Sequence, residues 1–174
     1  MKHLFALASC ALFLAAPAMA QQVAATGPAD QVANQVDREF VETAASGGRV
    51  EVNDARIAEQ QALKDPVKRF ARRIITDHGK ANEQLTALAS QEGLNPPEQP
   101  DAKQKATANR LKTLSAAAFD RAYMRAEIKD HKETIALFEK EAASGQDPKL
   151  KAFAAETLPT LRRHLQMAQK LGTK

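Results

Sequence analysis

The strongest constraint on the fold is a repeated pattern of apolar side chains with helical spacing. Each predicted helix has one apolar face, which it must bury against another helix to be stable. The clearest stripe runs Val67, Phe70, Ala71, Ile74, His78, Ala81, Leu85 and Leu88. Positions three and four residues apart lie on one face of a helix. Strand signals are nearly absent, and the helix formers Ala, Leu, Lys, Glu, Gln and Arg dominate. The sequence therefore predicts an all-α protein whose helices bury their stripes against one another.

Helix start and stop signals divide the chain into four long helices. Asp65-Pro66 and Asp147-Pro148 each indicate an N-cap followed by proline in the first turn, and Gly93 indicates a helix end. We expect long helices over residues 37–63, 66–91, 116–143 and 148–172, with a short polar helix over 102–114 in the connection. Neither hairpin could bury its apolar face alone. The pattern predicts a ferritin-like four-helix bundle of two helical hairpins with a long crossover.

Ser46-Gly47-Gly48 interrupts the first predicted helix. Glycine weakens a helix, but it also lets a second helix approach closely. The segment is thus either a break or a close contact. Such a contact would lie within the bundle or between subunits, so the sequence leaves a homo-oligomer open.

The first 20 residues have the features of a secretory signal peptide. Lys2 supplies the positive start, residues 4–16 are apolar, and Ala18-Met19-Ala20 is a small-x-small cleavage site. We expect cleavage after Ala20, a periplasmic mature chain, a flexible leader over 21–36 and the bundle domain over 37–172. Residues 7–10 also fit a lipoprotein acylation site, but the apolar stretch continues beyond Cys10.

Composition excludes several classes of protein. Cys10 is the only cysteine and leaves with the signal peptide, so the mature chain has no disulfide. No later stretch is long and apolar enough to be a transmembrane segment. Acidic and basic residues are interspersed, and no long basic run is present, so nucleic acid is not expected as a partner.

Each histidine of the mature chain falls on the apolar stripe of a different predicted helix: His78, His131 and His164. Glu51 lies on the stripe of the first helix. At a rise of ~1.5 Å per residue, Glu51 and His78 both lie roughly 20 Å from the turn at residues 64–65 and face each other at one level. His131 and His164 lie roughly 20 to 27 Å from the turn near residue 146, which also places them near mid-bundle.

Neutral imidazoles with one carboxylate suit zinc, iron or copper. The sequence therefore predicts a transition-metal site formed by Glu51 and the three histidines. Asp77 and Asp130, each beside a histidine in the chain, are candidates to orient the ligands. Asp77 lies one residue off the stripe, so a solvated position is its alternative.

Asp120 and Tyr123 complete the set of candidate outer residues. Asp120 is also placed to cap the third long helix or to pair with Arg121 or Arg125. Tyr123 equally fits a core position in which its hydroxyl is hydrogen-bonded.

Buried histidines are ordinary core residues when their nitrogens are hydrogen-bonded, and buried carboxylates can pair with them. The alternative function is therefore a metal-free structural or protein-interaction module of the cell envelope. An oxidoreductase with a di-iron centre is disfavoured, because bundle di-iron sites use Glu-x-x-His on two helices. Ile75 precedes His78 at that spacing, and Leu161 precedes His164. No catalytic residue is identified.

Four segments together resemble a known bacterial family: FVETAASGGRVEVNDARIA, VKRFARRIITDHGKANEQLTALA, AAFDRAYMRAEIKDHKETIALFE and LPTLRRHLQMAQ. They are similar to the exported domain-of-unknown-function family numbered 4142, over about residues 37–171. The family's pattern falls on Glu51, Asp77, His78, Phe119, Asp120, Tyr123, His131, Pro159 and His164. The resemblance implies a ferritin-like bundle in the periplasm or cell envelope, and it implies no activity. Related exported bundles with histidines have been linked to metal handling, which is an analogy.

Overall fold

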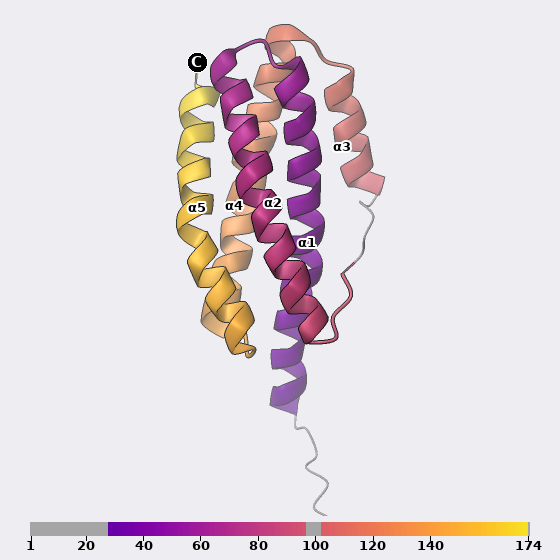
Figure 1. Cartoon of the computed structure of the whole chain (residues 1–174), viewed down its shortest axis with the longest axis vertical. Helices are drawn as coiled ribbons and strands as arrows, with labels where there is room; N and C mark the ends of the chain where they lie inside the picture. The colour runs from indigo at the N-terminus through magenta and orange to yellow at the C-terminus, as the bar shows by residue number, and fades with distance from the viewer. Residues whose placement is uncertain (1–27, 97–101, 174) are drawn as a thin grey trace, which may run out of the picture.

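The computed structural model describes residues 28–96 and 102–173, and these ranges contain helices joined by short loops and no strand. The helices are α1 (Pro28–Gln61), α2 (Asp65–Gln91), α3 (Ala102–Lys112), α4 (Ala116–Ser144) and α5 (Pro148–Gly172) (Figure 1). The four long helices and the short connecting helix confirm the expected all-α class. The predicted signal peptide and acylation site lie outside the described residues.

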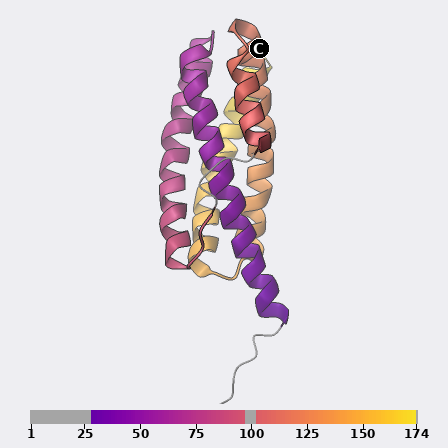
Figure 2. The ribbon, with the colours of Figure 1, turned by 90° about the vertical axis from the view of Figure 1, so that its right-hand side faces the viewer.

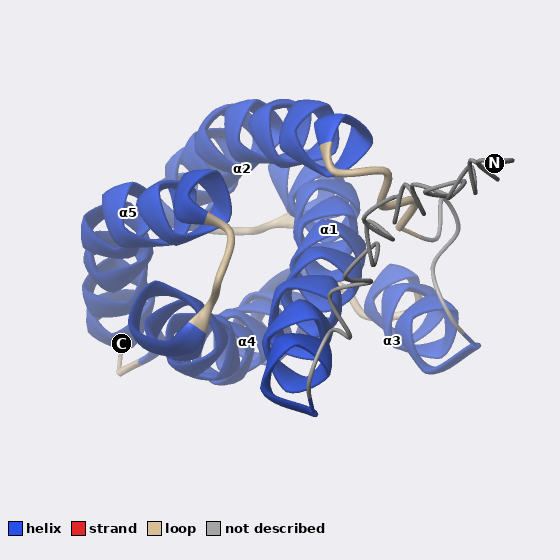
Figure 3. Cartoon of the chain, turned by 90° about the horizontal axis from the view of Figure 1, so that it is seen from below, coloured by secondary structure: helices blue, strands red, loops and turns tan. Residues whose placement is uncertain are grey.

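The long helices form two antiparallel hairpins, α1–α2 and α4–α5, whose turns lie at opposite ends of the bundle (Figures 1 and 2). Seen end-on, the helices follow one another around the bundle as α1, α2, α5 and α4, with α3 outside beside α1 and α4 (Figure 3). The connection that contains α3 returns the chain along the length of the bundle. Ala108 and Leu111 of α3 are buried in the core. This is the ferritin-like arrangement that the sequence predicts.

Two expectations about helix starts are wrong. Helix α1 begins at Pro28, so residues 28–36 are helical rather than a flexible leader; proline suits a first helical turn, since its missing N–H would be unpaired there. Asp65 lies inside the first turn of α2, where Lys64 is the N-cap residue and no side chain caps the helix. Asp147 does cap α5, accepting hydrogen bonds from the amides of residues 149 and 150.

None of the helices in the described ranges combines the length and the apolar character that a membrane crossing requires.

The C-terminal end of α2 is closed by a glycine turn. Gly93 follows the C-cap of α2 with a φ of 67°. The Leu94 amide donates to the Ala89 carbonyl, and the Gly93 amide donates to the Ser90 carbonyl. This Schellman motif ends α2 as the sequence indicates.

The core consists of two apolar clusters with a polar layer between them. The first cluster includes Phe70, Ile74, Phe119 and Tyr123 and lies toward the α1–α2 turn. The second includes Phe40, Leu85, Phe138, Leu150 and Phe153 and lies toward the α4–α5 turn. Each long helix contributes to both clusters and crosses the polar layer between them at mid-length. That layer holds the buried histidines.

A buried aspartate from each hairpin holds the turn of the other hairpin. The Asp120 carboxylate on α4 accepts hydrogen bonds from the amides of residues 63 and 64, at 2.9 and 3.0 Å. The Asp37 carboxylate on α1 accepts from the amides of residues 146 and 147, at 2.9 and 3.1 Å. The two aspartates therefore fix how far each hairpin slides along the other. Asp120 lies at this turn, so the expectation that it supports the histidine site is wrong.

Gly48 is a point of close helix contact within the bundle. Helix α1 continues through Gly47 and Gly48 without a break. A Cβ atom at Gly48 would clash with the side chain of Asn82 on α2, whereas one at Gly47 would meet nothing. The glycine therefore lets α2 approach α1 one turn before Glu51.

Replacing Asp120 with alanine should lower the free energy of unfolding by about 3 kcal/mol. Hydrogen bonds to a charged acceptor contribute about 1.5–3 kcal/mol each, and two part-buried amide bonds are lost. Urea denaturation followed by circular dichroism measures the change. Asp65→Ala at the same turn is the control, since this exposed carboxylate should contribute no more than about 1 kcal/mol through the helix dipole. Equal effects of the two substitutions would contradict the role of Asp120.

Candidate metal centre

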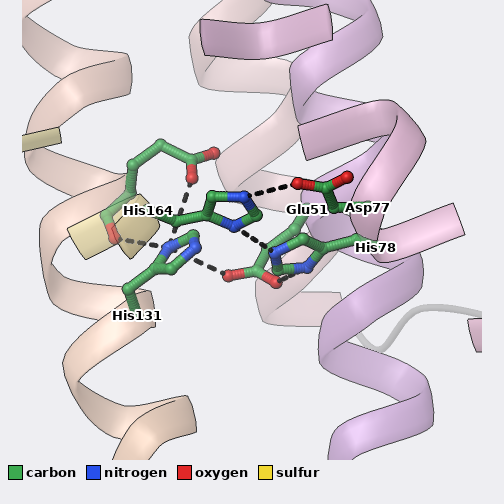
Figure 4. A network of polar contacts seen from close by, with 6 residues as sticks. Glu51, Asp77, His78, His131 and His164 are labelled. Atoms are coloured by element: carbon green, nitrogen blue, oxygen red, sulfur yellow. Dashed lines mark hydrogen bonds and ion pairs between the residues drawn. The ribbon is translucent and has the colours of Figure 1, made fainter. Parts of the chain in front are cut away.

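Four polar side chains from the four long helices meet at mid-bundle (Figure 4). They are Glu51 on α1, His78 on α2, His131 on α4 and His164 on α5, and each retains at most 6% of its accessible surface. The ring centroids of the three histidines lie 5.3 to 5.5 Å apart. The sequence placed these residues at one level, and the structure brings them together.

One nitrogen of each imidazole is held by an acceptor of the protein. The His78 Nδ1 atom lies 2.7 Å from Glu51 Oε2. The His164 Nε2 atom lies 2.9 Å from Asp77 Oδ2, and the His131 Nδ1 atom lies 3.0 Å from the carbonyl oxygen of Glu127. An acceptor on one nitrogen fixes the tautomer and directs the lone pair of the other nitrogen.

The three remaining nitrogens are therefore the ones available as ligands. The His78 Nε2 and His164 Nδ1 atoms face each other at 3.3 Å. The His131 Nε2 atom is buried and has no hydrogen-bond partner. Ligand atoms of the three histidines lie within 4.8 Å of one another. The arrangement is three converging imidazoles, each oriented from behind by an oxygen atom.

Charge in this layer is concentrated on the Glu51–His78 pair. Burial opposes the imidazolium form of His78, but the Glu51 carboxylate outweighs burial and raises the His78 pKa. Burial likewise opposes the Glu51 carboxylate, and the positive charge of His78 reverses the effect and lowers the Glu51 pKa. A protonated His78 can donate to both Glu51 and His164. It thereby satisfies the nitrogen–nitrogen contact without a metal.

Burial lowers the pKa of the other two histidines and so favours their neutral forms. Burial lowers the pKa of His131, which the carboxylate of Glu51 offsets only in part. Burial and the nearby charge of His78 lower the pKa of His164 to about 4. Neutral imidazole is the form that binds metal ions, so two of the three rings are ready as ligands at neutral pH.

Glu127 is a buried residue of the layer that sequence reasoning missed. Its Oε2 atom lies 3.4 Å from His131 Nδ1, and its side chain is nearly inaccessible. Burial, reinforced by the negative charge of Glu51, raises the Glu127 pKa well above its ordinary value. The available signal was the spacing of four residues between Glu127 and His131, which places both on one face of α4.

The predicted outer residues are divided among different environments. Asp77 holds His164 across the α2–α5 interface and not its chain neighbour His78. Asp130 pairs with Lys129 at 3.6 Å, and the Asp130 side chain is 42% exposed. Its expected role in orienting His131 is therefore wrong. Tyr123 is fully buried, and its hydroxyl faces the Glu127 carboxyl without forming a hydrogen bond of good geometry.

Fold and site together define a ferritin-like helical bundle with a buried histidine–carboxylate layer. The chain belongs to the family described as "Domain of unknown function (DUF4142)", whose profile matches residues 20–171. No curated protein matches the sequence.

Solved structures with the same fold include two kinds of helical domain. A DUF305 fragment from Deinococcus radiodurans has a TM-score of 0.70 and 18% identity, over 80% of this chain and 97% of that one. CopM in its Cu(II)-bound form has a TM-score of 0.67 and 18% identity, over 79% of this chain and 95% of that one. CopM in its Ag-bound form has a TM-score of 0.64 and 19% identity, over 77% and 93%. At these identities the likeness establishes the fold alone.

In the metal-free protein the three imidazoles should titrate at different pH values. We expect His164 to stay neutral until the pH falls to about 4, and His78 to stay protonated above the ordinary value of 6.5. Since an unfolded chain takes up the His164 proton near 6.5, this group destabilises the fold as the pH falls from 6.5 to about 4. His78 acts in the opposite sense: its contribution is complete below 6.5 and is lost as the pH rises through its raised pKa. NMR of the imidazole C2 protons measures all three, and a common pKa near 6.5 would contradict the assignment.

Proposed function

We propose that this protein binds a transition-metal ion at mid-bundle through the Nε2 of His78, the Nε2 of His131 and the Nδ1 of His164. The observation that carries the proposal is the convergence of three buried imidazoles whose other nitrogens are all held by oxygen atoms. Metal-ligating histidines have this arrangement almost without exception. Glu51, predicted as a ligand, serves here to orient His78.

The spacing of the donors supports the proposal. Two nitrogens in a tetrahedral site with bonds of ~2.0–2.1 Å lie about 3.3–3.4 Å apart. His78 Nε2 and His164 Nδ1 are separated by 3.3 Å. Three imidazoles leave a fourth position open, which is the pattern of exchangeable or reactive sites rather than closed structural ones.

Copper and zinc are the first ions to test. Imidazole nitrogen suits Zn(II) and Cu(II), and no thiolate is available among the described residues. CopM, which has the same fold, has been solved in Cu(I)-, Cu(II)- and Ag-bound forms. Metal handling in the cell envelope therefore fits this chain better than a di-iron activity.

Titration calorimetry of EDTA-treated protein with Cu(II) and with Zn(II) tests the site. We expect one ion per chain, an affinity loss of at least about 100-fold in His164→Ala, and a loss of 10–100-fold in Asp77→Asn, which removes only the orienting group. Asp130→Asn is the matched control, since this carboxylate also adjoins a histidine but faces Lys129. The proposal is wrong if no stoichiometric metal binds, or if Asp130→Asn lowers the metal affinity as much as Asp77→Asn does.

The second candidate is a metal-free structural or interaction module, and one observation favours it. A proton on His78 closes the contacts to Glu51 and His164, so both nitrogens of His78 are satisfied without an ion. The same experiments separate the two functions. A chelator would leave the melting temperature unchanged in a metal-free module, whereas a metal-binding chain is stabilised by its ligand.

We also propose that the protein is exported and works in the periplasm or cell envelope. The support is the sequence of residues 1–20, with its positive start, apolar stretch and small-x-small site. Mass spectrometry of the protein recovered from the periplasmic fraction should give a chain that begins at Gln21. Substituting Ala18 and Ala20 with larger residues should leave the signal peptide uncleaved. A cytoplasmic chain that begins at residue 1 would contradict export.

A further inference from the structure

A second set of ligand atoms lies beside the three imidazoles. Glu51 on α1 and Glu127 on α4 direct carboxylate oxygens at the Nδ1 of His131, at 3.5 and 3.4 Å. Ligand atoms of the three residues lie within 4.8 Å of one another. Glu51 Oε1 and Glu127 Oε2 are fully buried and have no hydrogen-bond partner. Buried oxygens of this kind are rare unless a proton, water or ion completes them.

The charge of this region is also incomplete. Two buried carboxyl groups approach each other, and Asp54, which is 6% exposed, lies near Glu51 on the same helix. Among the described residues, His78 is a cationic partner of Glu51, and it already pairs with the other oxygen of that carboxylate. Burial and the charge of Glu51 raise the pKa of the Glu127 carboxyl, so its ionised form needs a counter-charge here. A bound cation would supply that charge.

We propose that Glu51 Oε1, Glu127 Oε2 and His131 Nδ1 form a second metal position, which takes a hard divalent cation of the Mn(II) class. Two carboxylate oxygens and one imidazole nitrogen suit such ions, whereas the three-imidazole position suits Cu(II) and Zn(II). The Tyr123 hydroxyl faces Glu127 from one turn away and is not counted among the ligands.

The two positions exclude each other because both need His131. A neutral imidazole has one lone pair. In the three-imidazole position the ring binds through Nε2 and donates Nδ1–H to the Glu127 carbonyl. In the carboxylate position it binds through Nδ1. The chain therefore holds one ion at a time. The ion's preference for nitrogen or oxygen ligands decides whether it binds at Nε2 or at Nδ1 of His131. Only this competition rests on the proposed function; the carboxylate position stands by itself.

Two variants separate the positions, since Glu127 belongs to one set and His164 to the other. Mn(II) binding is followed by the loss of the EPR signal of the aquo ion, and Zn(II) binding by calorimetry. We expect Glu127→Gln to weaken Mn(II) by at least about 100-fold, more than an outer-shell change would, and to leave Zn(II) within about threefold. His164→Ala should do the reverse. His131→Ala should lose both ions.

Competition and controls complete the test. Zn(II) added to the Mn(II)-loaded chain should release one Mn(II) for each ion bound. Tyr123→Phe and Asp130→Asn should keep Mn(II) binding within about threefold, and the melting temperature of each variant reports its folding. No Mn(II) binding, or binding that survives Glu127→Gln, overturns the carboxylate position. Two ions held together overturn the exclusion. Mn(II) binding without Zn(II) or Cu(II) binding would instead refute only the three-imidazole site.

Discussion

The Glu51–His78 ion pair is the interaction on which the middle of the bundle depends. The His78 Nδ1 and Glu51 Oε2 atoms lie 2.7 Å apart, and this contact joins α1 to α2 inside the buried core. A buried charge that loses its partner costs far more than the pair itself contributes. The other polar groups of the layer follow from this pair: His78 contacts His164 on α5, and Glu51 contacts His131 on α4. All four long helices must therefore meet in one register.

The turns fix the same register from the two ends. Asp120 and Asp37 each reach from one hairpin to the backbone of the other hairpin's turn. A helix surface made of Ala, Leu and Ile packs in several registers at similar free energy, whereas a carboxylate accepts hydrogen bonds from one pair of amides only. The bundle is thus aligned at three levels, and this alignment fixes the positions of the imidazoles. Preorganisation of this kind is what a metal site requires.

The sequence predicted the features that follow from helical periodicity. The long helices, their hairpin order and the level of Glu51 and His78 all depend on spacing along one helix, which is local information. The sequence missed the features that depend on contacts between helices. Spacing along one helix does not show which neighbouring helix a polar side chain contacts. Asp77 is assigned to His164 by the α2–α5 interface, and Asp120 to a turn 56 residues away. Glu127 was missed because a glutamate within a helix is ordinarily solvated, and its spacing of four residues from His131 was the one local signal of its place in the layer.

At the three-imidazole site proposed above, a metal ion would take the place of the proton between His78 and His164. The raised pKa of His78 favours its protonated form, in which Nε2–H faces His164 and Nδ1–H faces Glu51. An ion at the proposed site replaces the first proton and leaves the second in place, so the Glu51 hydrogen bond survives. Since burial already keeps His131 and His164 neutral, binding needs the release of one proton and little movement of the helices. Metal binding at the proposed site would therefore depend on pH.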